Sequence, residues 1–220
     1  MSTRDAVVMV VDDDAGVRNA MRTLLKSVGL ASELHASAQD FLSHYDAAQP
    51  GCVLLDIRMP GMSGLELQQE LNLRGATIPV IFMTGHGDIP MAVEAMQHGA
   101  FDFLQKPFRD QDLLDRIRRA LVRDAKLRES LGEHARIRAH LDSLTDRERE
   151  VLDLLVQGKQ NKAIAQVLDV SPRTIEIHRA RVMEKMDAQS VAELVRMMMN
   201  VDRFSGVVAG GVVPGCDSRD

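Results

Sequence analysis

The stretch VVDDDAGVR, residues 10–18, places three carboxylates, Asp12, Asp13 and Asp14, directly after an apolar run. A short run of β-branched apolar residues is typical of a buried strand. Three acids at the end of such a strand fit a metal site, a helix N-cap or a solvated loop. The rest of the sequence must supply partners for these acids before a metal site is favoured.

The first 122 residues alternate between short apolar runs and longer amphipathic segments. The expected strands lie at residues 6–11, 31–35, 52–57, 78–84 and 100–106. The expected helices lie at residues 17–28, 38–46, 63–73, 89–97 and 109–122. This alternation predicts a parallel sheet of five strands with helices on both faces. Ligands of such sheets bind beyond the carboxyl ends of the strands, where the three acids lie.

Three further strand ends supply partners for the acids. Asp56, Thr84 and Lys106 lie near the ends of the third, fourth and fifth expected strands. Adjacent parallel strands would bring Asp56 close to the first acids, and such an oxygen-rich set suits Mg²⁺. Lys106 would neutralise an incoming phosphoryl group that carboxylates repel, and Thr84 offers a hydroxyl to one of its oxygens.

The residues at these strand ends, in this order, resemble the receiver domain of two-component response regulators. The resemblance rests on the loop MPGMSG at residues 59–64 and on Asp12-Asp13, Asp56, Thr84 and Lys106-Pro107. The segment MTGHGDIPMAVEAM, residues 83–96, resembles the FixJ-like branch of that family. The resemblance covers about residues 6–122 and implies a flavodoxin-like, doubly wound α/β receiver domain, assigned to residues 1–122.

The resemblance implies a role for each acid. Asp56 would accept a phosphoryl group from a phosphohistidine of a sensor histidine kinase. Asp13, Asp56 and the backbone carbonyl of Arg58 would hold the Mg²⁺ cofactor, and Asp12 would act mainly through bound water. Asp14 is assigned to the N-terminus of the following helix, where a carboxylate caps backbone amides.

The remaining receiver residues would sense and transmit phosphorylation. Lys106 would pair with the phosphoryl oxygens, and its peptide bond to Pro107 is expected to be cis. Thr84 would move toward the phosphoryl group, and Phe103 would turn inward behind it. Phosphorylation is then expected to produce a homodimer through the side formed by the fourth helix, the fifth strand and the fifth helix.

Residues 123–142 have a loose helical spacing of apolar residues and predict a helical linker. A solvated single helix and a coiled-coil seam are both compatible with it, and Gly132 weakens a continuous helix. Thr145 and Glu148 form the pattern of a capping box at the start of a four-helix domain, residues 143–200. Residues 201–220 are expected to form a flexible tail.

The segment NKAIAQVLDVSPRTIEIHRARVMEKM, residues 161–186, has the spacing of a helix-turn-helix, for which an ordinary helical bundle is the plain alternative. With LTDREREVL before it, this segment is similar to the LuxR-type DNA-binding domain. Burial of Ile175 and Val182 would leave the opposite face of the second helix for the major groove. Val167 is among the expected packing positions.

The predicted DNA contacts fall into two groups. By resemblance, the residues nearest to base edges are Glu176, Ile177 and Ala180, and Arg181 shares their face. The expected phosphate contacts are Asn161, Lys162, Arg173, Thr174, Arg179 and Lys185. Residues 143–200 carry 9 basic and 9 acidic side chains, so one copy would bind DNA weakly, and two copies on paired half-sites are expected.

Composition excludes several other classes of protein. Apolar residues make up 45% of the chain and charged residues 27%, as in globular proteins, and no apolar stretch is long enough to span a bilayer. The N-terminus lacks the pattern of a secretory signal. The two cysteines match no metal-binding spacing. The chain is therefore expected in the cytoplasm, with no membrane partner.

Together these patterns predict a phosphorylation-activated transcriptional regulator that binds double-stranded promoter DNA, with RNA polymerase as a further candidate partner. It is not expected to be an enzyme, beyond slow autodephosphorylation. The alternative is a haloacid-dehalogenase-like, Mg²⁺-dependent phosphatase, which also uses a strand-end aspartate. Such phosphatases need a second Asp two residues after the nucleophile, and this chain has Arg58 there.

Overall fold

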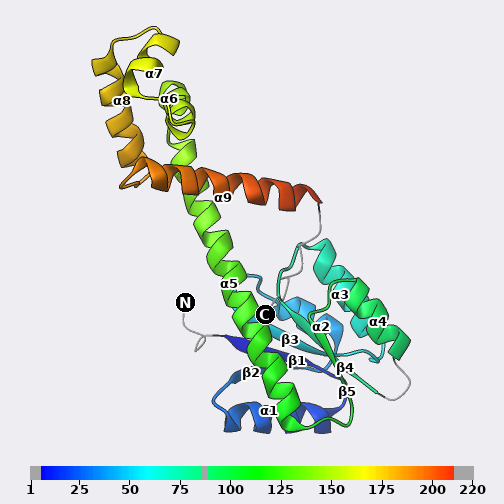
Figure 1. Ribbon diagram of the computed structural model, residues 1–220. Helices are drawn as coiled ribbons and strands as arrows, with labels where there is room; N and C mark the ends of the chain where they lie inside the picture. The colour runs from blue at the N-terminus through cyan, green and yellow to red at the C-terminus, as the bar shows by residue number, and fades with distance from the viewer. Residues whose placement is uncertain (1–5, 86–88, 211–220) are drawn as a thin grey trace, which may run out of the picture. The chain divides into compact units, whose positions relative to one another are not determined.

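The structure, a computed structural model, describes residues 6–85 and 89–210. The chain divides into two compact units, Met1–Glu129 and Ser130–Asp220, and each unit has its own apolar core. One helix, α5 (Asp110–Asp142), contributes residues to both units (Figure 1).

The first unit is a parallel α/β fold. Its strands are β1 (Val7–Val11), β2 (Ala31–His35), β3 (Gly51–Asp56), β4 (Val80–Thr84) and β5 (Asp102–Gln105). Its helices are α1 (Ala15–Ser27), α2 (Ala38–His44), α3 (Gly64–Leu73), α4 (Ile89–Gln97) and the first part of α5. All neighbouring strands pair in parallel, in the order β2-β1-β3-β4-β5. The predicted sheet of five parallel strands is confirmed.

The side chains of each strand point alternately to the two faces of the sheet, and one apolar core forms on each face. In β1, Val8 and Val10 pack with helices α1 and α5, and Met9 and Val11 pack with α2, α3 and α4. Successive side chains of a strand point to opposite faces, so a strand covered by helices on both sides must be apolar throughout. This requirement explains the continuous apolar runs of β1, β3 and β4, whereas the edge strand β2 carries Ser32 and Glu33 within it.

The loop after β3 returns the chain very close to the strand that it leaves. Ser63 caps α3 in a capping box with Glu66, and the amide of Gly64 donates to the carbonyl of Ile57 at 3.0 Å. A Cβ atom at Gly64 would lie 2.2 Å from the backbone oxygen of Asp56. Only glycine fits at this position, so the MPGMSG loop holds the end of β3 by direct backbone contact.

Helix α5 is continuous through the segment that the sequence predicts as a linker. Its Asp124 is buried and accepts from the amide of Gly51 at 3.0 Å and from Nε of Arg128 at 2.8 Å. Arg128 also donates to the carbonyls of residues 47–49 before β3. The first unit therefore extends past residue 122, where the sequence places its end, to Glu129.

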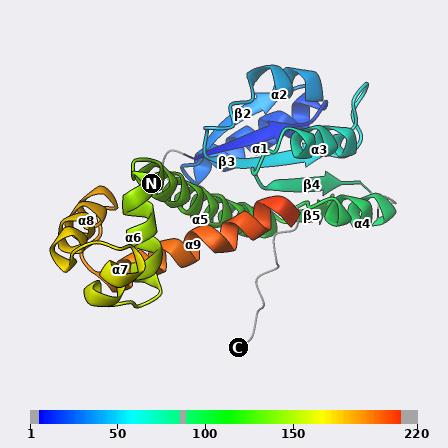
Figure 2. The ribbon, with the colours of Figure 1, turned by 90° about the horizontal axis from the view of Figure 1, so that it is seen from above.

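The second unit is a helical bundle. It contains α6 (Asp146–Val156), α7 (Asn161–Val167), α8 (Pro172–Lys185) and α9 (Val191–Gly210), and α6, α7 and α8 gather closely in Figure 2. Ile137, near the end of α5, is buried in the same core as Val151 and Ile175. No helix within residues 6–85 and 89–210 is long and apolar enough to cross a membrane.

Two features of this unit differ from the sequence expectations. Helix α9 continues to Gly210, past the predicted end at residue 200, so residues 201–210 are helical and residues 211–220 lie outside the described part. Val167 was predicted to pack in the core, which is wrong, because its side chain is 58% exposed. It is the last residue of the short helix α7, where only Ile164 and Ala165 reach the core.

A buried ion pair joins α6 to α8. Thr145 and Glu148 form the predicted capping box, and Glu148 also accepts from Nζ of Lys185 at 2.7 Å. These contacts, first the hydrogen bond from Lys185 and then the amide of Thr145, lower the pKa of Glu148 to about 2. The ionised carboxylate therefore stabilises the start of α6 and its contact with α8.

Replacing Gly64 with alanine should destabilise the first unit by about 1–3 kcal/mol, the usual cost of overpacking, because the new methyl group meets backbone atoms. Gly132→Ala is the matched control, since a Cβ there has no atom within 4 Å, and alanine should stabilise the helix by up to about 1 kcal/mol. Denaturant unfolding of both variants tests this. Equal effects of the two substitutions would contradict the close-approach argument.

The Glu148 carboxylate should make stability depend on pH. Its folded-state pKa lies below the unfolded value of about 4.3, so its contribution is present above that pH and is lost as pH falls toward about 2. Glutamine keeps the capping box but not the charge. Thermal melts of full-length Glu148→Gln should lie a few degrees below wild type at neutral pH, and the difference should shrink in acid.

Glu150→Gln, on the exposed side of the same helix, provides the control and should show a much smaller difference at every pH. A constant gap between wild type and Glu148→Gln from neutral pH down to acid would show that the carboxylate charge is not the cause.

Candidate functional sites

A lysine joins two carboxylates at the carboxyl edge of the sheet. Nζ of Lys106 lies 2.9 Å from Oδ2 of Asp12 and 2.7 Å from Oδ1 of Asp56. Asp12 follows β1, Asp56 ends β3, and Lys106 follows β5, so three strands bring them together. The Asp12 side chain is 2% exposed and that of Asp56 13%, which makes these charge-assisted bonds shielded from water.

Burial and hydrogen bonding shift the pKa of Asp56 in opposite directions, and the same is true of Lys106. Burial raises the pKa of Asp56, although hydrogen bonds from Lys106 and from the amide of Arg58, at 2.8 Å, oppose the shift. Burial alone would lower the pKa of Lys106, but its bonds to Asp56 and Asp12 outweigh burial and raise it. The lysine therefore stays charged at neutral pH.

The other predicted receiver residues lie on β4 or β5, or directly after β5. Thr84 ends β4 and is buried, and its carbonyl accepts from the amide of Lys106 at 2.7 Å. Phe103 lies on β5 with its side chain 40% exposed, so it faces outward here. The Lys106–Pro107 peptide bond is cis, as predicted.

The three adjacent acids separate into different environments. Asp12 is buried, Asp13 is exposed, and Asp14 accepts from the amides of Gly16 and Val17 as the N-cap of α1. The predicted role of Asp14 as a helix cap is confirmed. Sequence reasoning missed Arg18, whose guanidinium donates to the carbonyl of Asp12 at 2.6 Å and helps to fix the first turn beside the site.

The donor set fits a small, hard cation. The carboxylates of Asp12, Asp13 and Asp56 and the carbonyl of Arg58 offer only oxygen atoms, the ligands that Mg²⁺ prefers. Of these carboxylates only Asp13 is exposed, and Asp12 and Asp56 already share one ammonium group. The residues present therefore suit Mg²⁺ bound through few protein ligands and several waters.

In the second unit, one face of α8 is exposed over its whole length. Ile175 and Val182 are fully buried against α6 and α7, as predicted. The exposed residues recur every three or four positions and so share the opposite face. They are Arg173, Glu176, Ile177, Ala180 and Arg181. Ile177 is 50% exposed, so this face also presents an apolar side chain.

The residues predicted to contact DNA phosphates differ in exposure and in the groups that they already bind. Nη1 of Arg179 donates to Oδ1 of Asn161 at 3.2 Å, which joins α8 to the start of α7. Lys162 is exposed, and Thr174 contacts the N-cap Ser171. Lys185, by contrast, is held by Glu148 and by the carbonyl of Ser143, so its ammonium is engaged inside the domain.

Comparison with known families covers both units. Residues 8–118 match the response regulator receiver domain, and residues 142–198 match the bacterial regulatory proteins of the luxR family. The chain belongs to the response regulators. The matches confirm the predicted pairing of a receiver domain with a LuxR-type DNA-binding domain, and they give no support to the phosphatase alternative.

Relatives of this response regulator match it over most of their length. The transcriptional regulatory protein FixJ of Azorhizobium caulinodans is 50% identical, over 87% of this chain and 91% of its own. The response regulator protein TmoT of Ectopseudomonas mendocina is 44% identical, over 90% of both chains. The solved structure of the response regulator StyR has a TM-score of 0.84 and 44% identity, over 89% of this chain and 98% of its own.

A crystal structure of full-length FixJ from B. japonicum is also similar to this response regulator. It has a TM-score of 0.57 and 43% identity, over 90% of this chain and 98% of its own. The similarity therefore includes both domains and the helix between them. These relatives are named as regulators of transcription or as response regulators, not as enzymes.

Proposed function

We propose that this response regulator accepts a phosphoryl group on Asp56 from a sensor histidine kinase and thereby controls DNA binding by α8. The observation that carries the proposal is the Lys106 ammonium, which binds both Asp12 and Asp56 at the edge of the sheet. A cation at this position lets a carboxylate nucleophile approach a phosphoryl group that it would otherwise repel.

The transfer follows from the groups present. An oxygen of Asp56 attacks the phosphorus of a kinase phosphohistidine, the phosphorus–nitrogen bond breaks, and the imidazole leaves with the bonding electron pair. Lys106 then pairs with an oxygen of the new acyl phosphate. Mg²⁺, when bound by Asp13, Asp56 and the carbonyl of Arg58, neutralises phosphoryl charge, and Asp12 acts through bound water. Water would hydrolyse the acyl phosphate slowly, without making the protein an enzyme.

The signal passes from the phosphoryl group to β4 and β5. Thr84 turns its hydroxyl toward a phosphoryl oxygen, and Phe103 rotates inward into the space that Thr84 vacates. Three exposed apolar side chains on α4 and β5, Val93, Met96 and Phe103, support a dimer surface here, since such groups favour contact with a partner. Phosphorylation would then pair two chains, with the segment 123–142 joining receiver to DNA-binding domain.

Paired chains would place two copies of α8 on neighbouring half-sites of promoter DNA. Glu176, Ile177 and Ala180 face base edges, and Arg181 lies beside them. The phosphate contacts are Asn161, Lys162, Arg173, Thr174, Arg179 and Lys185. Lys185 can contribute mainly as a fixed charge, because Glu148 already holds its ammonium. RNA polymerase is a further partner if the protein activates transcription.

Asp56→Asn should abolish phosphorylation by acetyl phosphate with Mg²⁺ present and should leave the protein at the wild-type unphosphorylated oligomeric state. Phosphate-affinity gels and light scattering measure the two effects. Asp46→Asn, an exposed carboxylate in the loop before β3, is the control and should behave as wild type. Unchanged dimerisation and DNA binding in phosphorylated wild type would overturn the switch.

The two groups of DNA contacts should respond differently to substitution. Arg173→Ala should weaken binding to all sequences alike and reduce the salt slope of log affinity by about 1, because it removes a phosphate contact. Glu176→Ala should instead relax preference at one base position, worth about 1–3 kcal/mol. Arg22→Ala on α1, an exposed arginine of the receiver, is the control. Similar salt slopes and base preferences in all three variants would contradict this assignment.

A further inference from the structure

Two imidazoles and a carboxylate converge where β2 ends and α2 begins. His35 is the last residue of β2, and Asp40 and His44 lie four residues apart on one face of α2. Nδ1 of His35 lies 3.3 Å from Oδ2 of Asp40, and Nδ1 of His44 lies 3.3 Å from Oδ1. Each of the three residues therefore offers a ligand atom, from an imidazole or a carboxylate, close to those of the other two.

The two 3.3 Å spacings run to different oxygens of Asp40, and each is short enough for a pair of ligands on one ion. With metal–ligand bonds of about 2.0–2.2 Å, two ligands of a tetrahedral ion lie about 3.3–3.6 Å apart. One potential ligand atom from each of the three residues lies within 4.8 Å of the others, so small side-chain rotations would close the set. Coordination by Nδ1 of His44 would replace its 2.8 Å contact with the carbonyl of Asp40.

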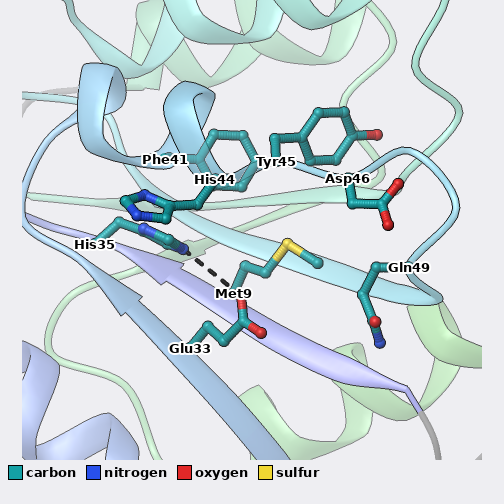
Figure 3. Close-up of a pocket in the computed structure, with 8 residues that line it drawn as sticks. All are labelled: Met9, Glu33, His35, Phe41, His44, Tyr45, Asp46 and Gln49. Atoms are coloured by element: carbon teal, nitrogen blue, oxygen red, sulfur yellow. Dashed lines mark ion pairs between the residues drawn. The ribbon is translucent and has the colours of Figure 1, made fainter.

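The surroundings of His35 resemble those of a metal-bound histidine. Its ring is 8% exposed and packs edge-on against Phe41, which fixes its orientation. On the other side of the ring, Nε2 lies 4.0 Å from a carboxylate oxygen of Glu33 (Figure 3). A histidine that binds a metal through one nitrogen commonly directs the other toward a carboxylate, which sets its tautomer.

The cluster is also accessible. His44 is 65% exposed, and its ring lies beside that of His35 at the wall of a pocket that Glu33 and Tyr45 also line (Figure 3). The pocket gives an ion access to the two imidazoles, and Asp40, which does not line the pocket, is 41% exposed. Water can complete the coordination, as at zinc sites with three protein ligands.

We propose that His35, Asp40 and His44 form a binding site for a divalent transition-metal ion of the Zn²⁺ class, separate from the carboxylate site at Asp56. Two imidazole nitrogens select Zn²⁺ and similar ions over Mg²⁺, which prefers oxygen ligands. The bound ion would tie α2 to the end of β2 and so stabilise the receiver unit by mass action.

The test is calorimetric titration of the full-length protein with ZnCl₂ in excess Mg²⁺, which occupies the carboxylate site. One Zn²⁺ should bind per chain, and His44→Ala and Asp40→Asn should each weaken binding at least tenfold. Zn²⁺ should also raise the thermal midpoint of wild type but not of His44→Ala. His98→Ala is the matched control, because His98 is exposed and its Nδ1 also contacts the carbonyl four residues earlier, at 2.8 Å.

The outcomes separate this site from the phosphoacceptor. Asp56→Asn should keep full Zn²⁺ binding, so a failure of the proposed phosphorylation would leave this result intact. No Zn²⁺ binding by wild type overturns the proposal. Equal binding by wild type, His44→Ala and Asp40→Asn also overturns it, because the ion would then bind elsewhere on the chain.

Discussion

The receiver unit depends on a charge constraint at one edge of its sheet. Asp12 and Asp56 are removed from water at the ends of adjacent strands, and two carboxylates so placed repel each other. Lys106, two strands away from Asp56 in the sheet, places its ammonium between the two carboxylates and offsets their repulsion. The strand order and the close return of the chain at Gly64 place the strand ends that carry these three groups side by side.

The apolar runs of the sequence were sufficient to predict β1, β3 and β4, because a strand covered on both faces must be apolar throughout. The edge strands β2 and β5 have weaker patterns, and their prediction depended on the alternation of strands with helices. The same logic placed Asp12, Asp56, Thr84 and Lys106 at one edge. The ends of helices were harder, as α9 shows, since Gly206 and Gly210 have weak helix propensity and favoured an earlier end than the structure has. The surface position of Val167 was missed because an apolar residue in a short helix gives no periodic signal.

Contacts between distant segments were beyond the reach of pattern analysis. Asp124 and Arg128 look like ordinary charges on a linker helix, yet they bind backbone groups of residues 47–51, which lie far away in the sequence. The convergence of His35 with Asp40 and His44 was hidden for a related reason. Two of the three residues have helical spacing, but the third comes from a strand whose register only the folded sheet defines.

Helix α5 connects the two cores covalently, with Ile117 in the receiver core and Ile137 in the core of the second unit. Gly132 lies between them and is the residue there with the weakest helix propensity. A domain with no net charge gains little from nonspecific attraction to DNA, so a single copy is expected to bind DNA weakly. On the proposed mechanism, pairing of two receivers therefore increases DNA affinity more than a change within one chain would. Once one α8 is bound, pairing raises the effective concentration of the second α8 at its half-site.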